Sequence, residues 1–376
     1  MDSEIQPSEQ QSHAVRTEPP QNGTTSTPAP PHNIFIGSQG LRSGWSVAIF
    51  MAIFVFLLAT ISFVARLITV NLLHHTPTAG SAMTPATTIV GEGGAVLAIL
   101  GAAAIVAKIE RRRILDYNLA GPSPIARFAG GLLAGFAALS ALVAALYLGG
   151  WLHFGPVALT GGQILQYAAL WAIGFLLVGC TEEGICRCYL QFTFTRGINF
   201  WWALGIVALF CAALIPQFKN QSAWGIWFFA AAGLVPCLIL HLKNAVQSTF
   251  WYAAWATSTF FGFVHTGNNG ETWIGVFAAA AIGFVFCVSV RVTGSAWWAI
   301  GCHAAWDWAE TFFYGTADSG YAAKGHFLTT TPAGNTLWSG GTDGPEGSLL
   351  VLPTIALILV IVLVQYGRKK QAALAS

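Results

Sequence analysis

The stretch WSVAIFMAIFVFLLATISFVAR, residues 45–66, carries no charged side chain before its last residue. About 20 apolar residues are enough for a helix to cross the roughly 30 Å hydrocarbon core of a bilayer. The stretch therefore predicts a transmembrane helix, and nine further segments have a similar character. These segments are residues 84–107, 128–152, 163–195, 198–215, 223–242, 246–265, 273–291, 295–314 and 348–366.

The composition of the whole chain points the same way. Hydrophobic residues make up 55% of the 376 residues and charged residues only 9%, whereas a soluble protein has roughly 25% charged residues. So few charges cannot cover a water-facing surface, and we predict an all-α polytopic integral membrane protein with about ten transmembrane helices. The net charge of +2 is too small to suggest nucleic-acid binding. The seven cysteines lie in apolar stretches, which favours buried thiols over disulfides.

Two of the ten segments depart from the usual length of a span. Residues 163–195 exceed one perpendicular crossing and are expected to tilt or to extend into the cytosol. Residues 198–215 are short enough to form a re-entrant helix.

The ends of the chain and the basic residues suggest an organisation and an orientation. Residues 1–40 are rich in Gln, Ser, Thr and Pro, and are predicted to be disordered. With a cytosolic N-terminus and ten spans, most Lys and Arg residues fall on the cytosolic side, as the positive-inside rule requires. We therefore predict that both termini are cytosolic, in the plasma or inner membrane if the source is bacterial. The oligomeric state is left open.

Within the predicted spans, the stretch TEEGICR, residues 181–187, carries the first of three polar clusters. Ionisable groups inside a membrane are expensive and are usually functional. Glu183 and Arg187 are four residues apart, so they share a helix face and can form an ion pair. Glu182 points about 100° away and has no local partner. A carboxylate without a partner at low dielectric is suited to act as a general base.

The second and third clusters lie on later segments. In the second, Phe261 and His265 share a helix face, and in the third His303 and Asp307 stack four residues apart. Each cluster alone also fits an interfacial histidine or a polar pair that joins helices. Together the three clusters supply carboxylates and imidazoles from separate spans, and convergence in one cavity is the simplest explanation. Such a group can activate a water molecule and polarise a carbonyl, with or without a metal ion.

The order of these three motifs on successive membrane helices resembles the CPBP intramembrane protease family, which includes the type II CAAX prenyl endopeptidases and their bacterial relatives. The motifs are Glu182-Glu183-x-x-x-Arg187, Phe261-x-x-x-His265 and His303-x-x-x-Asp307. The resemblance covers about residues 108–348. It implies a membrane-embedded protease core there, with N-terminal transmembrane helices at 41–107 and a C-terminal helix with a basic tail at 349–376.

The resemblance also implies roles for individual residues. Glu182 and His265 would activate the hydrolytic water, while His303 and Asp307 would stabilise the oxyanion or assist a metal. Glu183 and Arg187 would support this site. Asn268, which follows the second motif, is assigned a supporting role as well.

The substrate would be a membrane-associated peptide or protein, including a prenylated CAAX tail. Glu182, His265 and His303 could hold a divalent metal such as zinc with one open position, and the same residues could equally act without one. The choice between a metalloprotease and a glutamate-type protease stays open.

Two departures from the family pattern affect this interpretation. The third motif ends in Asp307, where Asn is often found, so this side chain must be protonated, orient His303 or ligate a metal. Residues 198–245 place two additional apolar segments between the first and second motifs. Two additional crossings preserve the orientation of everything that follows them.

Two other classes of function fit the same residues. A transporter or proton-coupled permease could use the buried carboxylates and histidines as a relay. A non-catalytic immunity or scaffold protein could keep the fold and bind a partner. Assays of peptide cleavage, of Glu182-dependent uptake and of the biological activity of Glu182→Gln separate these classes.

Overall fold

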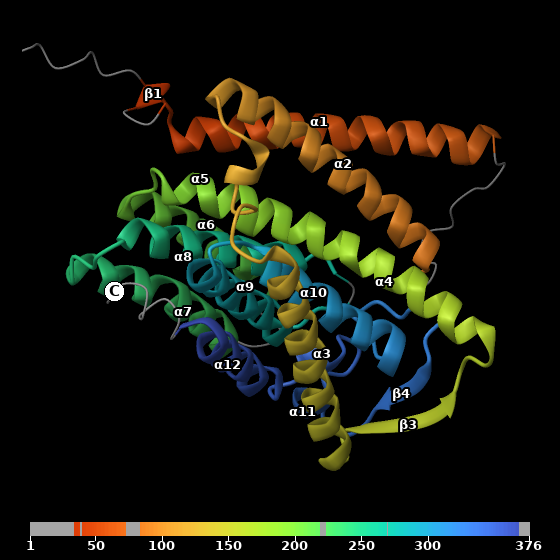
Figure 1. Ribbon diagram of the computed structural model, residues 1–376. Coiled ribbons are helices and arrows are strands. Elements are labelled where there is room, and N and C mark those ends of the chain that lie inside the picture. Colours follow the sequence, from red (N-terminus) through yellow and green to blue (C-terminus); the bar gives the residue numbers. More distant parts are fainter. Residues whose placement is uncertain (1–33, 38–39, 73–82, 219–222, 269, 368–376) are drawn as a thin grey trace, which may run out of the picture. The chain divides into compact units, whose positions relative to one another are not determined.

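The computed structural model describes residues 34–37, 40–72, 83–218, 223–268 and 270–367 (Figure 1). The chain divides into residues 1–34 and 35–376, and every described helix and strand belongs to the second unit. Most of the tail predicted to be disordered lies outside the described residues. At its end, β1 (Ile36–Gly37) pairs with β2 (Gly40–Leu41) in an antiparallel ladder.

Each of the ten predicted apolar segments coincides with a helix, which confirms the all-α class of the fold. The described helices are α1 (Ser43–Leu67), α2 (Pro85–Glu110), α3 (Pro124–Leu148), α4 (Gly162–Glu183), α5 (Gln191–Thr195), α6 (Phe200–Phe218), α7 (Ala223–Leu242), α8 (Ser248–His265), α9 (Trp273–Thr293), α10 (Trp297–Trp308), α11 (Thr336–Ser339) and α12 (Val351–Val362). Short 3-10 turns are η2 (Ile114–Asp116) and η5 (Pro345–Gly347), and π-helical turns are η1 (Ile68–Leu72), η3 (Gly184–Leu190), η4 (Ala309–Tyr314) and η6 (Leu363–Gly367).

Six helices of the described chain are long and apolar enough to cross a membrane. α6, which was predicted to be short enough for a re-entrant helix, has 19 residues and is one of the six. Two other apolar helices, Trp227–Leu242 and Val351–Gly367, are shorter. A polytopic membrane fold is confirmed, whereas the number of ten crossings stays a prediction.

The longest helical segment carries the first polar motif. α4, η3 and α5 run without a break over 34 residues, Gly162–Thr195, as predicted for residues 163–195. The regular helix ends at Glu183 and continues as the π-helical turn η3, which contains Arg187. π-Helical turns inside α-helices are often found at functional sites. This one lies within the Glu182-Glu183-x-x-x-Arg187 motif.

α10, which carries the third motif, packs closely against α3 and α4. Gly131 and Gly135 on α3 face the backbone of Trp298 and Cys302, so that a methyl group at either glycine would overlap a carbonyl oxygen of α10. Small residues four apart let membrane helices approach to backbone contact, where packing rather than the hydrophobic effect holds them together. The two glycines therefore set the position of His303, which follows Cys302.

A two-stranded sheet lies at one end of the helices (Figure 1). β3 (Leu152–Val157) pairs antiparallel with β4 (Leu328–Pro332), an element that was not predicted from the sequence. The predicted span 128–152 is therefore shifted rather than shortened, because α3 covers Pro124–Leu148 and Leu152 already belongs to β3. The β-branched run Thr329–Thr331 favours a strand. The pairing anchors the long 315–347 loop to the rest of the structure.

The seven cysteines are all free thiols, as predicted. Six are buried, and Cys180 is partly exposed.

Replacing Gly135 tests the packing of α3 on α10. We expect Gly135→Ala to lower the free energy of unfolding by about 1–3 kcal/mol, because overpacking forces two backbones apart. A methyl group added at Gly205 on α6 would meet no atom within 4 Å, so Gly205→Ala serves as the matched control. Thermal unfolding in detergent measures both changes. An equal, small effect of the two substitutions would contradict this account of the helix contact.

Candidate active site

The structure gathers the predicted site residues around one cavity of about 280 Å³. Its lining comes from α2, α4, α8, α9, α10, α12 and the 315–347 loop. The four residues predicted to be catalytic, Glu182, His265, His303 and Asp307, all line this cavity. Asn268, which was predicted to support the site, lines it as well.

Glu183 connects two of the three motifs. Its Oε2 lies 3.1 Å from Nε of Arg187 in the expected i, i+4 ion pair, and both side chains are fully buried. Its Oε1 accepts a hydrogen bond from Nδ1 of His303 at 2.9 Å. One buried carboxylate thus joins the first motif on α4 and η3 to the third motif on α10.

Arg187 connects the first motif to the second. Its guanidinium carbon lies 4.2 Å from the centre of the Phe261 ring, at a distance typical of a cation–π contact. Gly283 on α9 makes room for this group, since a methyl group there would lie 2.5 Å from Nη2 of Arg187. The backbone carbonyl of Arg187 accepts a hydrogen bond from Nδ2 of Asn118 at 2.7 Å. Arg187 is thereby held from several sides.

His303 lies among three carboxylates. Because an ionised carboxylate can only accept hydrogen bonds, Nδ1 of His303 carries the proton that it shares with Glu183. Nε2 lies 3.5 Å from Oδ2 of Asp307 and 3.7 Å from Oε2 of Glu182. The ring is therefore fixed on one side by Glu183, while Nε2 faces the cavity.

His265 is oriented by the backbone of its own helix. Nδ1 lies 2.7 Å from the carbonyl oxygen of Phe261, and a carbonyl oxygen only accepts hydrogen bonds, so Nδ1 is the donor. In the neutral ring, Nε2 then keeps its lone pair and can accept a proton. Phe261 therefore has two contacts in the site. Its carbonyl oxygen orients His265, and its ring covers Arg187.

Asn268 connects the cavity to two neighbouring carboxylates in the loops, those of Glu271 and Asp343. Its Nδ2 donates to Oε2 of Glu271 at 3.3 Å. Asp343 accepts from the hydroxyl of Thr272 at 2.7 Å and from the backbone N–H of Thr272 at 3.2 Å. Burial and the nearby Asp343 carboxylate raise the pKa of Glu271 from 4.5 to about 9.

Sequence reasoning missed several residues of this region. Glu92 on α2 lines the cavity, and the cost of a carboxylate inside an apolar helix was the signal that could have identified it. Asn118 left no such signal, because its contact with Arg187 joins residues 69 positions apart. The acidic residues Asp318 and Glu346 of the 315–347 loop also line the cavity.

The three predicted metal ligands converge only in part. Nε2 of His303 lies 3.7 Å from Oε2 of Glu182. In the described part of the chain, however, these two and His265 do not form a group whose ligand atoms all lie within 4.8 Å of one another, whereas Glu310, Asp318 and Glu346 do. A divalent metal at the catalytic residues stays a prediction.

A comparison with family models bears on the second and third motifs. The model described as type II CAAX prenyl endopeptidase Rce1-like matches residues 237–309. Residues 237–309 are Rce1-like. This Rce1-like segment contains His265, Asn268, His303 and Asp307, and it confirms the resemblance that the motifs suggested. No curated protein and no solved structure matches the chain significantly.

The apolar helices indicate an integral membrane protein, and residues 237–309 of it are similar to the type II CAAX prenyl endopeptidase family. Glu182, Glu183 and Arg187 lie outside the matched residues. They join the Rce1-like segment through the contacts of Glu183 with His303 and of Arg187 with Phe261.

The ion pair of Glu183 and Arg187 can be tested with a double-mutant cycle. Glu183→Gln leaves the Arg187 charge buried without its partner, so we expect a loss of about 3–5 kcal/mol in the free energy of unfolding. Arg187→Met should cost a similar amount for the converse reason. The double variant should lose less than the sum, measured by unfolding in detergent. Additive losses would contradict a direct interaction.

Glu271 predicts a pH dependence of stability. Between about 4.5 and 9 the folded protein keeps a proton that the unfolded chain has lost, so stability falls as the pH rises through this window. In Glu271→Gln the melting temperature should depend less on pH between neutral and alkaline conditions. Asp116→Asn is the control, because its pKa is lowered and its carboxylate is ionised throughout this range. An unchanged slope in Glu271→Gln would overturn the assignment.

Proposed function

We propose that this chain is an intramembrane endopeptidase that hydrolyses a peptide bond of a membrane-associated substrate. The observation that carries the proposal is the position of Glu182, His265 and His303 on the wall of one cavity. They come from three different helices, and the Rce1-like segment supplies two of them. The arrangement offers both proton acceptors and a donor, which hydrolysis of an amide requires.

In the proposed reaction Glu182 and Nε2 of His265 bind and deprotonate a water molecule. The water oxygen attacks the carbonyl carbon of the scissile bond, and the electron pair of the C=O bond moves to the oxygen. The protonated Nε2 of His303 donates a hydrogen bond to this oxyanion. When the intermediate collapses, the C–N bond breaks and the proton taken from water passes to the leaving amine.

The remaining residues hold these groups in place. Glu183 fixes the ring of His303 through Nδ1, and Arg187 balances the charge of Glu183. The sequence left three roles open for Asp307: a protonated side chain, a group that orients His303, or a metal ligand. Oδ2 of Asp307 lies 3.5 Å from Nε2 of His303, which supports the second role. These proposed steps use no metal ion at Glu182, His265 or His303, and assays with a chelator test whether cleavage depends on one.

The lining of the cavity supports a lipid-modified substrate. Apolar side chains such as Phe175, Ile282 and Ile355 lie beside the polar residues. A peptide carrying a prenyl group could place its chain against them, since apolar contact with the cavity wall would replace contact with lipid. We therefore propose CAAX-type peptides as the substrate class, with both termini of the enzyme in the cytosol, as the basic residues suggest.

The proposal can be tested with purified full-length protein and fluorogenic peptides. We expect cleavage of a prenylated peptide, and a loss of at least about 100-fold in kcat for Glu182→Gln and for His265→Ala, because each removes a proton acceptor. Asp116→Asn is a control carboxylate on the exposed η2 turn and should keep wild-type activity. Parallel assays with an unprenylated peptide and with a chelator separate substrate class from metal dependence.

Two outcomes would contradict hydrolysis as the function. Glu182-dependent uptake of a solute into proteoliposomes without peptide cleavage would favour the transporter. Intact biological activity of Glu182→Gln would favour the non-catalytic scaffold or immunity protein.

A further inference from the structure

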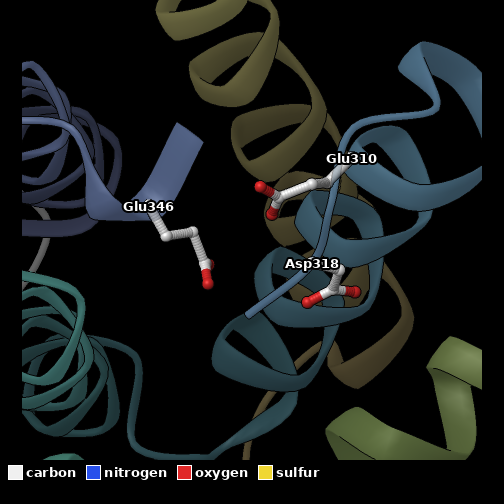
Figure 2. A group of neighbouring side chains, drawn as sticks. All are labelled: Glu310, Asp318 and Glu346. Atoms are coloured by element: carbon white, nitrogen blue, oxygen red, sulfur yellow. The ribbon is translucent and has the colours of Figure 1, made fainter. Parts of the chain in front are cut away.

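A second group of carboxylates lies beside the proposed active site and has no part in the proposed reaction. Glu310 belongs to η4, Asp318 to the loop that follows it, and Glu346 to η5. One carboxylate oxygen from each lies within 4.8 Å of the others. Figure 2 shows the three side chains converging from these separate segments. We refer to Glu310, Asp318 and Glu346 as the acidic triad.

Glu310 is the member of the acidic triad whose carboxylate is buried without a hydrogen-bond donor among the described residues. Its side chain is fully buried, and neither carboxylate oxygen has a hydrogen-bond partner within the described residues. Its carboxylate points toward the other two members of the acidic triad (Figure 2). A buried carboxylate without donors is strongly unfavourable unless a proton or a cation compensates its charge.

The other two members are oriented by neutral donors. Glu346 accepts from the indole N–H of Trp306 and from the hydroxyl of Ser319, both at 2.8 Å. Asp318 accepts from the hydroxyl of Thr311, also at 2.8 Å. A carboxylate oxygen that accepts one hydrogen bond keeps a second lone pair, so these donors fix the oxygens without occupying them. Hydrogen-bonded carboxylates of this kind are usual among metal ligands.

No described cationic side chain is paired directly with the acidic triad. In the part of the chain that the structure describes, no Lys, Arg or His forms an ion pair with any of its three members. Three carboxylates thus share one small volume with neutral donors only.

We propose that the acidic triad binds a divalent cation that prefers oxygen ligands, of the class of Ca²⁺, Mg²⁺ and Mn²⁺. Ca²⁺ binds oxygens at 2.3–2.6 Å, so two ligands of one ion lie up to about 5 Å apart, in agreement with the spacing of the acidic triad. Carboxylates without Cys or His select these ions over zinc. The site shares no residue with Glu182, His265 and His303.

The cation would connect the end of the catalytic helix to the 315–347 loop. Glu310 follows α10, which carries His303 and Asp307. Asp318 and Glu346 lie in the 315–347 loop and line the cavity. Binding would hold the loop residues against the cavity, and would stabilise the folded chain in proportion to the occupancy of the site.

Thermal unfolding of the full-length protein in detergent tests this site without any assay of cleavage. The protein is stripped with a chelator, desalted and titrated separately with CaCl₂, MgCl₂ and MnCl₂, and isothermal calorimetry measures affinity. We expect at least one cation to raise the melting temperature in a saturable way. Glu310→Gln, which removes the charge and keeps the shape, should weaken the affinity at least about tenfold, equivalent to 1.4 kcal/mol.

Two controls keep the test decisive. Asp318→Asn replaces Glu310→Gln if the latter does not fold, and it should weaken binding in the same way. Asp343→Asn alters another buried loop carboxylate, whose Oδ2 already accepts two hydrogen bonds from Thr272, and should bind the cation almost as wild type does. The proposal is overturned if no cation at millimolar concentration shifts the wild-type melting temperature. It is also overturned if the folded triad variants respond as wild type does.

Discussion

The arrangement of the candidate active site depends on one buried carboxylate. Glu183 pairs with Arg187 four residues along its own helix and accepts a hydrogen bond from His303 on α10. Arg187 in turn lies over Phe261, whose carbonyl oxygen orients His265. A charge buried this deeply is tolerated only with its partners in place, so the same electrostatic requirement that stabilises the fold also fixes the relative positions of the three motifs.

Much of this arrangement could be predicted from the sequence, because it rests on short-range spacing. The pairing of Glu183 with Arg187, the shared face of His303 and Asp307, and the location of the ten apolar helices follow from helical periodicity and hydropathy. The contact of Asn118 with Arg187 and the pairing of β3 with β4 join distant residues and left no local pattern. Glu92 did leave one, as a carboxylate in an apolar helix, and was overlooked. A zinc site at Glu182, His265 and His303 stays a prediction, because residue types alone do not determine the distances between ligands.

The glycines of α3 and the 315–347 loop position the groups that line the cavity. Close backbone contact at Gly131 and Gly135 places α10, and the loop contributes Asp318, Ser319 and Glu346 to the cavity wall. The proposed catalytic geometry therefore rests on this helix contact and on the loop beside it. The acidic triad, which joins the end of α10 to this loop, would supply that anchor through a bound cation.

A structure of full-length Glu182→Gln with an uncleaved prenylated peptide tests the central claim most directly. We predict that the scissile carbonyl oxygen lies about 3 Å from Nε2 of His303, and that the space for the attacking water lies between residue 182 and Nε2 of His265. His303 should still donate from Nδ1 to Glu183. A peptide bound outside this cavity, or a His303 ring turned away from both Glu183 and the peptide, would contradict the account.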